Sequence, residues 1–121
     1  MPKHVLTIGL DPSVADLTQF PGVTPDLVRS FIDSELERLR GQGYAVESCL
    51  VDLGETAEAV TTRHLNASRF DCVMIGAGLR APPQLLLFEK LINLVHAHAP
   101  NAKICFNTTP ADTTEAVQRW V

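Results

Sequence analysis

Apolar positions along the chain follow two alternating spacings. Short apolar runs, rich in aliphatic and β-branched residues, predict four strands, at residues 4–10, 44–53, 71–78 and 102–108. Apolar residues at helical spacing follow each run and predict four helices, at residues 25–41, 55–68, 83–98 and 110–120. A strand followed by a helix, four times in succession, is typical of a parallel sheet with helices on both faces.

Residues at the predicted helix starts support these boundaries. Thr24 and Pro25 are the expected N-cap and first-turn proline of the first helix, and Thr109 is the expected N-cap of the last one. Asp52 and Glu55 have the spacing of a capping box before the second helix. The charged residues of the first helix are assigned to its solvent face: Asp26, Asp33, Glu35, Glu37, Arg38 and Arg40.

Length and pattern together predict the architecture. The 121 residues suffice for one packed core, and we assign residues 1–121 to a single α/β domain. The run at 71–75 is apolar without interruption, as in a central parallel strand that is covered on both faces. We therefore predict a three-layer α/β/α sandwich whose four-stranded parallel sheet has the order 2-1-3-4.

Composition and charge narrow the function classes. Ten basic and fourteen acidic residues leave a net charge of −4, and the basic residues form no run. This excludes non-specific nucleic-acid binding, which needs a concentrated basic surface. The first apolar run is too short to be a signal segment or to span a membrane. We expect a cytoplasmic protein without membrane contact.

Cysteines and histidines indicate no metal or redox site. Cys49, Cys72 and Cys105 are widely spaced, form no CxxC pair and fall within the predicted strands, so we expect buried thiols in a reducing compartment. His96 and His98 are two residues apart on a predicted helix and therefore point in different directions, unlike a metal-binding pair.

The segment "GAGLRAPP", at residues 76–83, follows the third predicted strand. A similar segment occurs in small uncharacterised bacterial α/β proteins, which the whole chain resembles. By the order of its elements the chain also resembles flavodoxin-like domains and response-regulator receivers. It departs from their motifs, since the turn Gly76–Gly78 stands where a receiver has its phosphoacceptor and the first turn lacks GxGxxG. These resemblances imply a fold and no established activity.

Open parallel sheets bind ligands beyond the carboxyl ends of their strands, where the strand order reverses. In the predicted order this point lies between the first and third strands, with the fourth strand beside them. Seven residues follow these strands and form the expected binding crevice: Asp11, Ser13, Gly76, Gly78, Arg80, Asn107 and Thr108.

The glycine turn has two interpretations, binding or merely turning. Gly76 and Gly78 would let a ligand approach the backbone, and Arg80 is suited to a carboxylate or phosphate. Pro82 and Pro83, however, remove the N–H donors that an anion would use. The rim is also acidic, so a bound polyanion would need a bridging cation such as Mg²⁺. No cofactor motif is evident.

Asp11 and the loop after it also have two interpretations. The loop at 11–23 is long for a strand-to-helix connection and is either a binding lid or a variable surface loop. Asp11 is the most plausible functional carboxylate, or else it starts an Asp-Pro turn. Arg80 could equally pair with Asp11 or Asp52 and close the end of the sheet.

The helix predicted at 83–98 is too apolar for a single buried face. Its apolar residues form two neighbouring stripes, which favours a homodimer contact through Leu85–His98, the alternative being a deeply buried helix.

These features favour a module that binds a small polar ligand or a protein partner and has no covalent chemistry of its own. Substitution of Asp11 and Arg80 by alanine would test this hypothesis. The alternative is a small enzyme acting on a polar metabolite. Asp11 would then be its acid, base or metal ligand, and Arg80 would orient an acidic group of the substrate. A degenerate receiver-like interaction domain is a third hypothesis.

Overall fold

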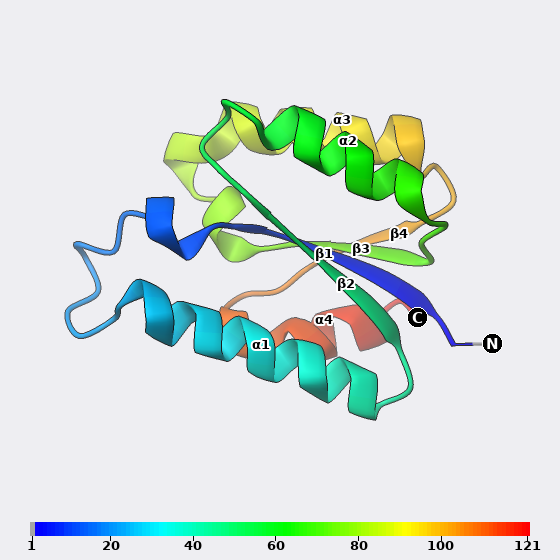
Figure 1. The fold of residues 1–121 in the computed structure, drawn as a ribbon, viewed down its shortest axis with the longest axis horizontal. Helices are drawn as coiled ribbons and strands as arrows, with labels where there is room; N and C mark the ends of the chain where they lie inside the picture. The colour runs from blue at the N-terminus through cyan, green and yellow to red at the C-terminus, as the bar shows by residue number, and fades with distance from the viewer. Residues whose placement is uncertain (1) are drawn as a thin grey trace.

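The computed structural model describes residues 2–121. Its parallel sheet has the order β2-β1-β3-β4 and is built from β1 (His4–Leu10), β2 (Ala45–Val51), β3 (Cys72–Ile75) and β4 (Lys103–Phe106). One face carries α1 (Pro25–Gly41) and α4 (Thr113–Gln118), and the other carries α2 (Ala57–Ala67) and α3 (Leu85–His98), as Figure 1 shows. This confirms the predicted three-layer, flavodoxin-like architecture and its strand order.

Short 3-10 turns replace the predicted helix or strand at the ends of several elements. They are η1 (Pro12–Val14), η2 (Ala77–Leu79), η3 (Pro82–Gln84) and η4 (Pro110–Asp112). The strand predicted at 71–78 therefore ends at Ile75, because the chain turns at Gly76. The third helix likewise begins at Leu85, after the two prolines have formed a turn of their own. The last helix ends at Gln118 instead of residue 120.

Two of the three predicted caps are confirmed. The Thr24 hydroxyl accepts a hydrogen bond from the Leu27 N–H at 3.1 Å, and Thr109 forms a capping box with Asp112 at the start of η4. The capping box at Asp52 was wrong. Asp52 instead accepts from the Gly54 and Thr56 N–H groups, because the loop turns at Gly54, whose φ of +138° favours glycine. The helix starts at Ala57.

Alternate strand residues build two different cores. The core under α2 and α3 is the larger one and includes Leu6, Ile8 and Ile75, all fully buried. The core under α1 and α4 is smaller, lies around Val5 and Leu39, and includes the Cys72 and Cys105 thiols. The three cysteines are buried, as predicted.

Packing within the chain accounts for most of the apolar surface of α3. Leu91 and Val95 are buried, and the neighbouring stripe is half-buried against the same core and against α2. Only Leu85 and Leu86, in the first turn, stand out, with 60% and 75% of their surface exposed. The homodimer contact through this helix stays a prediction, which light scattering would test.

No helix among residues 2–121 is long and apolar enough to cross a membrane.

Candidate functional site

A cavity of about 440 Å³ lies between α1 and the sheet, near the carboxyl ends of β1, β2 and β3. This is the point where the strand order reverses, as predicted for a binding site. We call it the α1 cavity. It is enclosed by the sheet, by the inner side of α1, by the β1–α1 loop and by the start of the last helical segment around Asn107 and Thr113.

Small side chains form the floor of the α1 cavity. Thr7 and Gly9 of β1, Ser48 of β2 and Gly76 after β3 all line it. Leu6, Ile8 and Ile75, which alternate with these residues, fill the opposite face, because successive residues of a strand point to opposite sides. A Cβ on Gly76 would lie 3.4 Å from the Ile8 carbonyl oxygen, which is ordinary van der Waals contact, so the packing of the strands does not by itself require glycine there. Larger residues of the same face, Leu50 and Met74, complete the floor beside them.

Apolar side chains form the roof and one end. Val28, Phe31 and Ile32 reach the cavity from α1, and Leu17 and Phe20 reach it from the β1–α1 loop. The predicted long loop is thus a wall of the cavity. Phe20 and Phe31 remain 57% and 45% exposed and mark the opening.

Asp11 starts the turn that leads into this loop. Its carboxylate accepts hydrogen bonds from the Ser13 N–H and hydroxyl, at 2.9 and 2.8 Å, and pairs with Arg29 at 2.7 Å. The Ser13 hydrogen bonds, and then the Arg29 charge, lower the pKa of Asp11. Asp11 and Ser13 are therefore joined to α1, outside the cavity lining, and Asp11 pairs with Arg29 instead of Arg80.

Arg80 connects the ends of two strands. Its guanidinium donates to the carbonyl oxygens of Ile75 and Asn107 and lies 4.8 Å from the centre of the Phe106 ring. Burial lowers the pKa of Arg80. Its closest partners are backbone groups of β3 and of the segment after β4, and it also donates to the Asn107 Oδ1 at 3.4 Å. Arg80 does not line the cavity.

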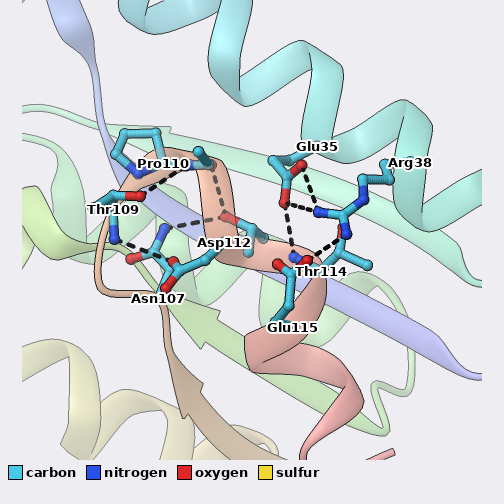
Figure 2. A network of polar contacts seen from close by, with 10 residues as sticks. Glu35, Arg38, Asn107, Thr109, Pro110, Asp112, Thr114 and Glu115 are labelled. Atoms are coloured by element: carbon cyan, nitrogen blue, oxygen red, sulfur yellow. Dashed lines mark hydrogen bonds and ion pairs between the residues drawn. The ribbon is translucent and has the colours of Figure 1, made fainter.

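Asn107 joins the glycine turn to the last helical segment. It is buried, its Oδ1 accepts from the Ala77 N–H at 2.9 Å, and its Nδ2 donates to the Thr113 hydroxyl at 3.1 Å. Thr108 is exposed, and its N–H donates to Asp112, which also accepts from the Thr109 N–H; Figure 2 shows Thr109 and Asp112 in this network. Burial raises the pKa of Asp112, but the hydrogen bonds from Thr108 and Thr109 outweigh it and lower the pKa overall.

Glu35 is the site residue that the sequence interpretation missed. It was assigned to the solvent face of α1, but it is only 6% exposed and lines the α1 cavity. Its carboxylate accepts from the Thr114 N–H at 2.9 Å and pairs with Arg38 at 3.3 Å (Figure 2). The available signal was its position, three residues after Ile32 and one before Leu36, inside the apolar stripe.

Of the predicted crevice residues, the structure brings Gly76, Gly78 and Asn107 to the cavity lining. The other four lie outside it: Asp11, Ser13, Arg80 and Thr108. Among residues 2–121, no group of three or more His, Cys, Asp or Glu side chains is placed to hold a metal ion.

A second hollow, of about 430 Å³, lies at the far end of the molecule between the C-terminal ends of α2 and α3. Two of its polar side chains, Asn66 and His98, already bond to each other at 3.1 Å. It contains none of the predicted site residues.

Comparison with known proteins adds no activity to this geometry. No protein-family model matches the chain, and a search of curated proteins found no match. The function therefore has to be inferred from the chemistry of the α1 cavity.

Proposed function

We propose that this protein binds a small molecule in the α1 cavity. The observation that carries the proposal is an apolar space of about 440 Å³ at the reversal point of the sheet, which is within the usual size range of ligand sites. The carboxyl end of an open parallel sheet is also the usual place of a ligand site.

The polar groups of the lining support binding without covalent chemistry. Glu35, Asn107 and Thr113 already bond to other residues, and Thr7 donates to the Glu47 carbonyl at 3.4 Å. None of these contacts pairs a nucleophile with a base. The enzyme alternative requires Asp11 and Arg80 to face one substrate, whereas Asp11 is paired with Arg29 and Arg80 with backbone carbonyls. No observation favours it.

Methyl NMR with toluene as a neutral probe tests the proposal. We expect saturable shifts of the cavity methyls, such as those of Val28, Leu36 and Leu50, while the methyls of Leu6 and Leu91 in the other core stay unchanged. Shifts that do not saturate, or that spread equally over both cores, would contradict a binding site in the cavity.

A matched pair of variants locates the probe. Ser48→Leu adds an apolar side chain to the cavity floor, and Ser34→Leu adds the same atoms to an exposed position of α1. We expect the toluene shifts to disappear in the first variant and to persist in the second. Gly9→Ala is a milder filling variant, because its new Cβ would meet only the Leu50 side chain, at 3.4 Å. Retained shifts in both filling variants would overturn the proposal.

A further inference from the structure

We infer that the α1 cavity takes a neutral, mostly apolar molecule with an aromatic ring, and not an anionic metabolite or nucleotide. This inference rests on the proposed function and names the ligand class of the same site. Three observations carry it: the charge of the lining, the state of its polar groups and the side chains at the opening.

The lining offers no partner to a charged ligand. Within the described chain, Glu35 is its one charged side chain, so an anion entering the cavity would meet a carboxylate and no cation. The nearby Arg29 is no free cation either, because it is already paired with Asp11. A cation fares no better, because Arg38 and the Thr114 N–H already hold the Glu35 carboxylate. Burying either charge without a new partner is unfavourable.

The lining also has few polar groups left for a ligand. Thr7, Glu35, Asn107 and Thr113 are each engaged in hydrogen bonds within the protein. Ser48 supplies the remaining side-chain hydroxyl, half-buried on the edge strand β2. A ligand rich in polar atoms would lose its hydration without replacement. The lining thus suits a molecule with one or very few polar atoms, one of which would meet Ser48.

Two phenylalanines mark the opening. Phe20 and Phe31 both line the cavity, and about half of each side chain is nonetheless exposed to solvent. An occupant with an aromatic ring would cover this surface and gain ring-to-ring contacts, whose edge and face geometry adds to the burial of apolar area. An aromatic ligand therefore uses the opening as well as the floor.

Two dyes that differ by one charged group test the inference. N-phenyl-1-naphthylamine is neutral, and 8-anilino-1-naphthalenesulfonate has the same ring skeleton with an added sulfonate. We expect the neutral dye to bind saturably to the wild-type protein and to Ser34→Leu, and to lose binding in Ser48→Leu. We expect the anionic dye to bind about tenfold more weakly or less, because its charge has no partner in the lining.

The outcomes separate the ligand class from the proposed function. Equal or tighter binding of the anionic dye, lost in Ser48→Leu, would overturn the neutral ligand class while the toluene shifts still supported a small-molecule site. Toluene shifts without binding of either dye would overturn the expectation of a larger aromatic ligand. Binding of the neutral dye that persists in Ser48→Leu would place the dye elsewhere and also overturn the inference. Absence of toluene shifts would reject the proposed function itself.

Discussion

The two faces of the sheet are formed by the same strands but are packed differently. On the face covered by α2 and α3, Leu6, Ile8 and Ile75 are fully buried and fill the space under the helices. On the face covered by α1, Thr7 and Gly9 occupy the alternate positions of the same strand, and a cavity remains. One face is packed for stability, and the other gives up packing for an interior space.

This difference shows how a four-stranded sheet can keep an interior space on one face without weakening its whole core. Large residues on one face supply most of the buried apolar surface, and the amino end of the other face is still closed by Val5, Leu39 and the buried thiols. The open part is confined to the carboxyl ends of the strands, where loops and helix starts meet. The expectations below test whether the two faces differ in this way.

The largest effect is expected from the same deletion made on each face. Ile75→Ala removes a fully buried side chain from the filled core and should lower the free energy of unfolding by about 2 to 5 kcal/mol. Ile32→Ala, at a half-buried position beside the cavity, should cost roughly 1 kcal/mol. Urea denaturation followed by circular dichroism measures both values. Equal losses would contradict the difference between the faces.

The next effect concerns the polar contact that holds α1 to α4. Glu35→Ala leaves the buried Thr114 N–H without an acceptor and should cost about 1 to 3 kcal/mol. Glu35→Gln keeps an acceptor and should cost less. Glu37→Ala is the control, because Glu37 is exposed and pairs only with Arg40, a contact worth about 1 kcal/mol or less. Urea midpoints give the order, and a loss in Glu35→Ala no greater than the control would sink this role.

A smaller loss is expected when Arg80 is replaced. Arg80→Ala leaves two strand-end carbonyls without their donor and should cost about 1 to 2 kcal/mol, since the site is half-buried. Because Arg80 lies outside the cavity lining, the toluene shifts of the cavity methyls should persist in this variant. Loss of those shifts in a folded Arg80→Ala protein would instead support a contact between Arg80 and the ligand, as the sequence predicted.

The smallest effect is a loss of stability in acid. The pKa values of Asp11 and Asp52 are lowered by turn hydrogen bonds, from Ser13 and from Thr56 respectively. A carboxyl with a lowered pKa contributes stability above its unfolded value, here 3.8, and loses it as the pH falls through the folded value. Thermal unfolding should be constant near neutral pH and decline below about pH 4. Asp11→Asn should reduce this decline, and an unchanged decline would reject the assignment.

The positions of the elements were predictable because local signals mark them. The strand at 4–10 was predicted to the residue, since an Asp-Pro turn follows it directly. Thr24 and Pro25 likewise mark the start of α1 in both sequence and structure. The small residues of the cavity floor were also visible, as Thr7 and Gly9 at alternate positions of an apolar run. The cavity above them could not be predicted from the sequence, because it depends on which helix covers that face of the sheet.

The roles of single polar residues were less predictable, because their partners are distant in sequence. Arg80 donates to the carbonyl of Asn107, 27 residues away, and no local pattern announces a backbone carbonyl as an acceptor. Glu35 bonds to an N–H that lies 79 residues along the chain. The only sequence signal was the position of Glu35 inside an apolar stripe. Its burial depends on where α4 begins.

The floor of the α1 cavity lies on residues that the filled core does not need. Gly9 has an ordinary backbone conformation, and only the Leu50 side chain is close to the Cβ that it lacks. Ser48 lies on an edge strand with the sheet on one side only. Substitutions at these two positions should therefore change the volume of the interior space with little effect on the core under α2 and α3.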